Sequence, residues 1–387
     1  MENVRIPLVK GVVSRQARTG WPEGTVEDEH GREGFAGNYS MLYRRRPPTQ
    51  WTRIEGPSRP RAMDMDALAA PDADDPDATP TLLLENEDVG IYVSRRRAAM
   101  PYYFRNVDGD EVHFVQHGEG RLETEYGDLS YEAGDYLVLP RGTTYRFHPA
   151  SADSYIVIVE SRTGEVALPD RGLLGHFVPF DAALFEHPEP SSTPLPDDQD
   201  EWEVRIKRGD VLTSFFYDAC PMDVVGWVGT LCPLKINVRT FRGIHSERTH
   251  LPPSAYATFR GPGYWIVTFT PKPLETAADA VRPPGYHRNV DYDEVIFSHS
   301  GRLVSRSETT GPLLTLHPAG VHHGPHPRAF ELTRDVERMD AYVINIDTHR
   351  ALRPAPAFDA AEQQDYWEQW KTPLTAAPLA GHRGSQT

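Results

Sequence analysis

Apolar and polar residues alternate along short stretches of this chain, and turn residues separate the stretches. Examples are residues 112–115, 120–126, 136–139 and 155–159. Because side chains of an extended strand point to opposite faces in turn, this alternation predicts β-strands. The 35 prolines and 30 glycines fit short strands with frequent turns better than they fit helices. The pattern therefore predicts an all-β protein with few helices.

Three segments depart from this alternation. Residues 56–80 are rich in Pro, Asp and Ala, a composition that predicts an exposed loop. Residues 187–203 are acidic and rich in proline, which predicts a linker between two domains. Residues 357–371 predict a short C-terminal helix, and the tail after residue 373 is expected to be disordered. The expected core contacts of this helix are Phe358, Ala361, Trp367 and Trp370.

The chain has 387 residues, which is long enough for two domains with separate cores. The segments above predict an N-terminal β-domain at 1–186, a linker at 187–203 and a second β-domain at 204–350. The C-terminal helix and its tail then occupy 351–387.

One stretch of the sequence occurs twice, at residues 104–118 and 287–301. Nine positions are identical in the two copies, including the run Arg-Asn-Val-Asp and the final glycine. A Pro-x-Gly sequence follows each copy, at 140–142 and 318–320. An internal repeat on this scale predicts two copies of one β-domain.

The two copies differ at positions that could bind a metal ion. His287 and His323 of the second copy correspond to Phe104 and Tyr145 of the first, whereas Glu294 is matched by a glutamate. Phenylalanine cannot ligate a metal, and an un-ionised tyrosine is a poor ligand. Two neutral imidazoles and one carboxylate, with further coordination positions open, suit non-haem Fe(II), although zinc or manganese can occupy similar sites. The second copy is therefore predicted to hold the metal, and the first to be metal-free and structural.

His287, Glu294 and His323 resemble the ligands of a cupin metal site. The motifs around them are Pro283-Pro-Gly-Tyr-His287-Arg-Asn289, His317 ahead of His323-Gly-Pro325, His250-Leu-Pro-Pro-Ser254 and Phe269-Thr-Pro-Lys-Pro273. Together these motifs resemble those of the homogentisate 1,2-dioxygenase family. This resemblance covers most of the chain and is most specific in its C-terminal half. It implies a bicupin fold, in which two jelly-roll (double-stranded β-helix) domains carry one degenerate and one intact metal site.

Two adjacent residues, Asp293 and Glu294, could supply the carboxylate ligand. The spacing from His287 to Glu294 is one residue longer than the resemblance leads us to expect, so either a bulge accommodates it or Asp293 is the ligand. We favour Glu294, because it keeps the spacing to Gly301 and matches Glu111 in the repeat.

The resemblance also implies an activity. It is the Fe(II)-dependent, extradiol-type ring cleavage of a substituted hydroquinone with both atoms of O2 incorporated. The best candidate reaction converts homogentisate to maleylacetoacetate, in the degradation of tyrosine and phenylalanine. Hydroquinone is a weak acid, so its deprotonation needs a base with a pKa near neutral, which histidine provides. The resemblance assigns this role to His250. For His317 two roles stay open, one close to the bound substrate or oxygen and one that is structural.

Some residues depart from the family pattern and leave the substrate open. Leu303 and Arg306 stand where a tyrosine and a lysine are expected to touch substrate. We expect Tyr286, Leu303 and Arg306 to bind the substrate, with Arg306 nearest its carboxylate, because Arg288 recurs as Arg105 and is better explained as structural. The alternatives are another hydroquinone, such as gentisate or a natural-product intermediate, a metal-dependent cupin isomerase, or a non-catalytic ligand-binding bicupin.

The net charge, the apolar runs and the cysteines of the chain limit which partners and which cellular location we expect. The formal charge of −16 argues against nucleic acid or an anionic membrane surface. We find neither a long apolar run nor a secretory signal, and Cys220 and Cys232 fit reduced thiols, so a cytoplasmic location is expected. The expected partners are thus a small aromatic acid and O2. The family resemblance adds a homo-oligomer, either a hexamer or a trimer.

Overall fold

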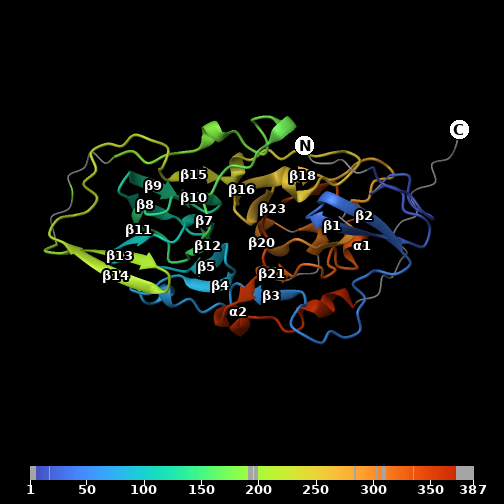
Figure 1. Ribbon diagram of the computed structural model, residues 1–387, viewed down its shortest axis with the longest axis horizontal. Helices are drawn as coiled ribbons and strands as arrows, with labels where there is room; N and C mark the ends of the chain where they lie inside the picture. The colour runs from blue at the N-terminus through green and yellow to red at the C-terminus, as the bar shows by residue number, and fades with distance from the viewer. Residues whose placement is uncertain are drawn as a thin grey trace.

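The computed structural model describes residues 6–16, 18–190, 195, 199–282, 285–301, 303–306, 311–333 and 335–371. Within these ranges the chain is almost entirely strand and turn, as predicted. The two α-helices are short: α1 is Ala329–Leu332 and α2 is Pro356–Ala360. In the described ranges, neither helix has the length or the apolar content that crossing a membrane would require. Figure 1 shows two β-rich lobes side by side.

The first lobe is a sandwich of two sheets. Its strands are β4 (Thr81–Glu85), β5 (Val89–Ser94), β6 (Tyr103–Asn106), β7 (Asp110–His117), β8 (Gly120–Thr124), β9 (Gly127–Tyr131), β10 (Asp135–Leu139), β11 (Thr144–Pro149), β12 (Tyr155–Ser161), β13 (Trp202–Arg208), β14 (Val211–Tyr217), β15 (Leu234–Asn237) and β24 (Arg353–Pro354). The sheet orders are β15-β10-β7-β12-β5-β4-β24 and β14-β13-β6-β11-β8-β9. The space between the two sheets holds a cluster of aromatic and aliphatic side chains.

The second lobe repeats this plan. Its strands are β1 (Val26–Glu33), β2 (Ala36–Arg44), β3 (Arg61–Asp64), β16 (Ala257–Gly261), β17 (Tyr264–Phe269), β18 (Lys272–Pro273), β19 (Tyr286–Asn289), β20 (Asp293–Gly301), β21 (Leu313–His317), β22 (Arg338–Met339) and β23 (Ala341–Thr348). One sheet has the order β16-β17-β23-β20-β21-β3, and opposite it lie the sheet β19-β1-β2 and the pair β18-β22.

Residues at equivalent positions of the repeat form the same strand pairings in both lobes. Phe104 of β6 faces Tyr145 of β11 in an antiparallel ladder, and His287 faces His323 in an antiparallel bridge. β13 runs parallel to β6, just as β1 runs parallel to β19. The shared pairing scheme makes both lobes members of one architecture, so the chain is a bicupin.

The lobes exchange their leading strands. β13, β14 and β15 precede the second repeat in sequence but belong to sheets of the first lobe, where β13 pairs with β6, β14 with β13, and β15 with β10. Reciprocally, β1, β2 and β3 precede the first repeat but pair with β19 and β21 of the second lobe. The strand pairing therefore crosses the boundary predicted at 187–203, because residues 202–237 complete the first lobe and residues 26–64 complete the second.

The segment predicted as an exposed loop is partly buried. Within residues 56–80, β3 forms the edge of a sheet, and Met63, Met65 and Leu68 enter the main core. The prediction was wrong here because the composition of the whole segment is dominated by its second half. The apolar residues lie before Pro71, where the Pro- and Asp-rich sequence begins.

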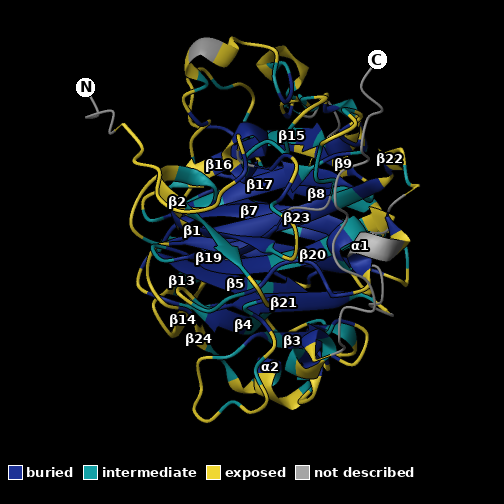
Figure 2. Cartoon of the chain, turned by 90° about the vertical axis from the view of Figure 1, so that its right-hand side faces the viewer, coloured by how far each residue is buried: buried dark blue, intermediate teal, exposed yellow. Residues whose placement is uncertain are grey.

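One core joins the lobes, and equivalent residues meet across it. Phe114 and Phe297 occupy the same position of the repeat, and their ring centroids lie 5.8 Å apart. Gln116 and His299 are likewise equivalent, and the Nδ1 atom of His299 lies 3.4 Å from the Gln116 Oε1 atom. Figure 2 shows these central strands as the most buried part of the molecule, with exposure confined largely to loops. Such a contact between equivalent surfaces is what a twofold axis produces.

The predicted C-terminal helix is split. Helix α2 ends at Ala360, and a 3₁₀ turn (η7) follows at Tyr366–Trp370. The segment between them leaves the helical path because it bonds to β3, where Gln363 N donates to Ala62 O. Phe358 and Trp370 are fully buried, as predicted. The predicted tail from residue 374 lies outside the described residues.

Candidate metal centre and substrate cavity

Three buried side chains converge inside the second barrel. His287 comes from β19, Glu294 from β20, and His323 from the segment that bridges back to β19. One ligand atom from each lies within 4.8 Å of the others. The backbones of His287 and His323 exchange two hydrogen bonds, of 3.0 and 2.9 Å, so the ladder itself sets the two imidazoles side by side.

The protons of these imidazoles are directed away from the centre. His287 Nδ1 lies 3.1 Å from Gly285 O, and His323 Nδ1 lies 3.0 Å from Val321 O. A carbonyl can only accept, so each Nδ1 donates and each Nε2 keeps its lone pair for the interior. Burial, together with the neighbouring His323 imidazole, holds the pKa of His287 well below its usual range, so this ring is neutral. Two neutral nitrogens and one carboxylate with oriented outer partners can hold a divalent first-row metal.

Asp293 points away from this group. Its two carboxylate oxygens accept hydrogen bonds of 2.7 Å from Ala319 N and Leu352 N. Asp110, the equivalent residue of the first lobe, accepts from two backbone amides in the same manner. The aspartate therefore anchors loops in both barrels. Of the two carboxylates left open by the spacing, Glu294 is the one beside the histidines.

His317 lies behind Glu294 and does not line the cavity. Its Nδ1 is 3.3 Å from Glu294 Oε1, and its ring stacks on His323 with 4.6 Å between centroids. Its other neighbours include Trp370 of η7. Burial, together with the charges of His323 and Arg306, lowers the pKa of His317 to about 3. A neutral, fully buried imidazole in this place can orient Glu294 rather than touch a substrate.

A cavity of about 720 Å³ opens from the three converging residues. Its apolar lining includes Phe269, Leu274, Ile296, Leu303, Val304 and Met339. Its polar lining includes His250, Lys272, Arg282, Arg306 and Asn345. This size and mixture of groups suit a small organic ligand with one ring, and the three cations favour a ligand that carries a negative charge.

His250 lies in the cavity wall next to a buried ion pair. Its Nδ1 is 3.6 Å from Glu275 Oε1, and Lys272 Nζ is 3.5 Å from the same oxygen. Burial lowers the pKa of His250 to about 4, and the positive charges of Lys272 and Arg18 act in the same direction. The near-neutral pKa expected from the sequence is therefore not what the structure gives, because the site is buried and rich in cations. His250 is nevertheless neutral at physiological pH and can accept a proton.

Phe35 is a cavity residue that the sequence did not reveal. It lies at the tip of the β1–β2 hairpin, and its φ of 68° is rare for a residue with a side chain. Its ring centroid is 4.4 Å from that of His287, and the Arg18 guanidinium carbon is 4.6 Å from the Phe35 ring. A strained conformation that is held by such contacts is typical of functional sites.

The residues predicted to bind substrate separate into two groups. Leu303 and Arg306 line the cavity. Tyr286 does not, because it precedes His287 on β19 and therefore faces the other side of the strand, where it packs with Trp21 and Val26. That prediction was wrong, because adjacent residues of a strand point to opposite faces and His287 points into the cavity.

Arg288 has structural partners, as its recurrence in the repeat suggested. Its Nη1 lies 3.2 Å from Asp28 Oδ2 and contacts His322. Asp28 belongs to β1, so this ion pair fastens the exchanged hairpin to β19. His322 faces away from the metal group, since its Nε2 lies 3.3 Å from the same carboxylate.

Several known proteins have sequences related to this chain. A family model described as "Homogentisate 1,2-dioxygenase N-terminal" matches residues 78–238. A protein of Saccharolobus solfataricus, provisionally named a dioxygenase, is 29% identical over 89% of this chain and 93% of its own length. The homogentisate 1,2-dioxygenase of Nitrobacter hamburgensis is 28% identical over 71% of this chain, and that of Bradyrhizobium diazoefficiens has the same identity and coverage. This chain covers 64% of the length of each of these two enzymes.

Among solved structures, a cupin 2 conserved barrel domain protein from Leptotrichia buccalis aligns with 70% of this chain and 88% of its own, at 8% identity and a TM-score of 0.35. The bicupin assignment therefore rests on the strand pairing of the chain itself. The sequence matches and the converging His-Glu-His group point the same way: the chain is similar to homogentisate 1,2-dioxygenases over most of its length.

Proposed function

We propose that this protein is an Fe(II)-dependent dioxygenase that opens the ring of a hydroquinone bearing an acidic side chain, with homogentisate as the best candidate. His287, Glu294 and His323 would hold the iron. The observation that carries the proposal is that this buried group opens directly into a cavity with a cationic lining. An iron site needs open positions for substrate and O2, and the cations would neutralise a substrate carboxylate.

Iron supplies a common binding point at which a reduced ring and O2 are activated together. The chain's own residues supply the rest. Neutral His250 accepts the proton of a ring hydroxyl, and Glu275 lies close enough to stabilise the imidazolium that forms. Phe35 and Leu303 give the ring apolar walls and exclude water. His317 keeps Glu294 in place from behind.

Arg306 is the best partner for the substrate carboxylate. Lys272 is already beside Glu275, and Arg282 donates through Nε to Glu275 O and through Nη1 to Val336 O. Arg306 donates through Nη1 to Gly324 O, and its Nη2 lies 3.4 Å from His317 Nε2, but no described carboxylate forms an ion pair with it. Its remaining N–H groups can form the forked contact that guanidinium makes with carboxylate.

Oxygen uptake by Fe(II)-reconstituted protein tests the proposal, with homogentisate, gentisate and plain hydroquinone compared. We expect rapid uptake with homogentisate, no uptake with His323→Ala, and a large rise in KM with Arg306→Leu. Uptake with gentisate alone would keep the chemistry and change the substrate. Absence of uptake with every quinol, although iron is bound, would contradict ring cleavage of these compounds, and turnover without O2 would indicate an isomerase.

We further propose that the protein acts in the cytoplasm as a homo-oligomer, either a trimer or a hexamer. The support lies in the edge strand β14, which is exposed along its whole length although it is rich in apolar residues. Such an exposed edge favours association with another chain. Light scattering after size exclusion should give a mass of three or six chains, and Phe215→Asp with Phe216→Asp should reduce it. A wild-type monomer would contradict the proposal.

A further inference from the structure

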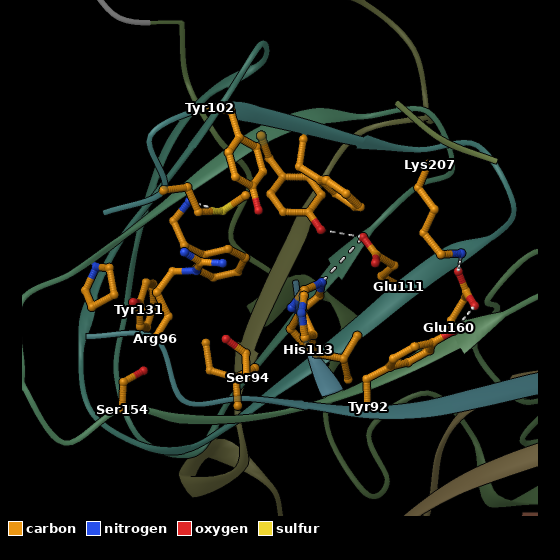
Figure 3. A pocket seen from close by; sticks show the side chains of 18 residues that line it. Tyr92, Ser94, Arg96, Tyr102, Glu111, His113, Tyr131, Ser154, Glu160 and Lys207 are labelled. Atoms are coloured by element: carbon orange, nitrogen blue, oxygen red, sulfur yellow. Dashed lines mark hydrogen bonds and ion pairs between the residues drawn. The ribbon is translucent and has the colours of Figure 1, made fainter. Parts of the chain in front are cut away.

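The first barrel, although it lacks the metal ligands, encloses a cavity of its own of about 680 Å³. Most of its wall is aromatic or aliphatic, and its lining residues all belong to the first lobe. Figure 3 shows Glu111, His113, Glu160 and Lys207 at one side of this cavity and Arg96, Tyr131 and Ser154 at the other. The apolar lining includes Met100, Tyr102, Phe104, Tyr145, Phe147 and Ile158.

A buried imidazole in this cavity has unused hydrogen-bonding capacity. His113 is 2% exposed, and neither ring nitrogen has a hydrogen-bond partner among the described residues. Its Nε2 lies 3.6 Å from Glu111 Oε2, which accepts a hydrogen bond of 2.8 Å from Tyr145 Oη. Across the cavity, the buried Tyr131 hydroxyl also lacks a hydrogen-bond partner among these residues. Buried polar groups are normally paired, so two such groups facing one cavity point to a ligand.

This imidazole takes the place of an apolar residue in the second barrel. His113 lies two residues after Glu111 on β7, so both side chains point to the same face. The equivalent of His113 is Ile296, which lines the substrate cavity of the second barrel. The first barrel thus lacks the two imidazoles that a metal would need. Its own imidazole, His113, stands at a different position of the repeat. Within the described residues the first barrel offers no group of three metal ligands.

The charges around the cavity favour a neutral ligand. Lys207 Nζ lies 2.6 Å from Asp108 Oδ2 and also contacts Glu160. Arg96 donates to the backbone carbonyls of Pro76 and Ala78. These cations are already engaged, and the carboxylate of Glu111 would repel an anion beside it.

We propose that the first barrel is a metal-independent binding site for a small, neutral aromatic molecule with a hydroxyl group, such as a phenol. Both oxygens of Glu111 already accept hydrogen bonds, from Tyr145 Oη and from Asn106 Nδ2, so the group that lacks a partner is His113. A hydroxyl both donates and accepts, so it can pair with either ring nitrogen of His113, and the ring lies against the aromatic wall. This proposal does not rest on the proposed ring cleavage.

Calorimetric titration of the full-length protein with three matched compounds tests it: 4-methylphenol, toluene and 4-methylbenzoate. The protein carries Leu303→Trp, which narrows the second cavity, so that binding reports on the first barrel. We expect 4-methylphenol to bind at one site, toluene to bind at least about tenfold more weakly, and 4-methylbenzoate not to bind. His113→Leu should reduce the difference between the first two compounds to less than about threefold.

Ile158→Phe, which fills the first cavity, should abolish binding, and thermal melting confirms that each variant is folded. If this variant does not fold, His113→Leu still decides the matter, because it changes polarity with little change in volume. Equal binding of toluene and 4-methylphenol, preferred binding of the benzoate, or no binding by the folded protein would each overturn the proposal. Loss of 4-methylphenol binding on introducing Leu303→Trp would overturn it as well, since the site would then be in the second barrel.

Discussion

The two barrels share a scaffold and differ in what fills it. Both place a glutamate on the same strand facing the interior, at 111 and 294, and both anchor a loop with the preceding aspartate. The interior positions 104 and 145 carry aromatic residues in one barrel, and their equivalents are histidines in the other. The scaffold therefore accepts either aromatic residues or histidines at these interior positions. A small number of inward-facing residues decide whether a barrel can bind a metal.

Glycines maintain the scaffold in both barrels. Gly118 directly follows β7 and Gly301 is the last residue of β20, with φ values of 91° and 73°. A Cβ atom on Gly118 would lie 2.7 Å from Asp153 O, and one on Gly301 would lie 1.8 Å from Asp340 O. No other residue fits there without moving the backbone. These positions are equivalent in the barrel with the His-Glu-His group and in the one without it, so they serve the fold rather than the chemistry.

The largest expected effect is the loss of the metal from the second barrel. His323→Ala removes one of three ligands, so bound metal should fall to background and oxygen uptake should fall at least about a thousandfold. Tyr145→Phe at the equivalent position should leave metal content unchanged, since that barrel has no metal group. Elemental analysis measures both. Equal metal loss in the two variants would contradict the assignment of the metal to one barrel.

The converse change should create a second metal site. Phe104→His combined with Tyr145→His restores both imidazoles beside Glu111, so bound metal should rise from about one to about two ions per chain. Phe104→His alone, with a single imidazole at these two positions, serves as the control and should show no rise. A folded double variant with unchanged metal content would show that the backbones of the two barrels differ more than their pairing indicates.

A smaller effect is expected from Phe35, which has no counterpart among the lining residues of the first barrel. Phe35→Ala should lower kcat/KM about 10- to 100-fold, because the substrate loses an aromatic wall and His287 loses a packing partner. Metal content should be retained. Tyr39→Ala on the same hairpin, where the side chain is 52% exposed, is the matched control. Equal effects of the two variants would locate the cause in the hairpin as a whole.

The smallest effect concerns the junction of the barrels and depends on pH. Burial, with the charges of His117 and Arg239, lowers the pKa of His299 to about 4, against 6.5 in its unperturbed state. Between these values the unfolded chain binds a proton that the folded protein does not, so stability falls as the pH is lowered from 6.5 to 4.

Replacing this histidine with the residue of the other barrel isolates the effect. His299→Gln should make the dependence shallower by up to about 1.4 kcal/mol per pH unit within that window. Thermal unfolding across this pH range measures it, with the exposed His176→Gln as the control. An unchanged slope in His299→Gln would show that other groups control acid stability.

The sequence predicted what is local or repeated. The alternation within residues 112–159 predicted the strands. The repeat singled out Glu294, which both copies share, and His287 and His323, which only the second copy has. The alternation could also have excluded Tyr286, because it precedes His287 on a strand. These inferences succeed because a strand fixes side-chain direction within a few residues.

Contacts between distant segments could not be predicted. Phe35 reaches the cavity only because β1 pairs with β19, more than 250 residues away. Residues 61–70 reach the core only because β3 pairs with β21. The pKa of His250 follows from burial and from neighbours on other strands. Each depends on tertiary packing, which leaves no periodic signal in the sequence.

The reciprocal exchange of leading strands has a consequence for the history of the chain. Two copies of one unit that swap their first strands about a twofold axis form a domain-swapped homodimer, and here a continuous polypeptide joins them. The association of free subunits depends on their concentration, whereas covalently joined units meet at a fixed effective concentration. Gene fusion thus removes the requirement that both copies be identical. One copy can then lose its metal ligands while its strands still complete the barrel of the other.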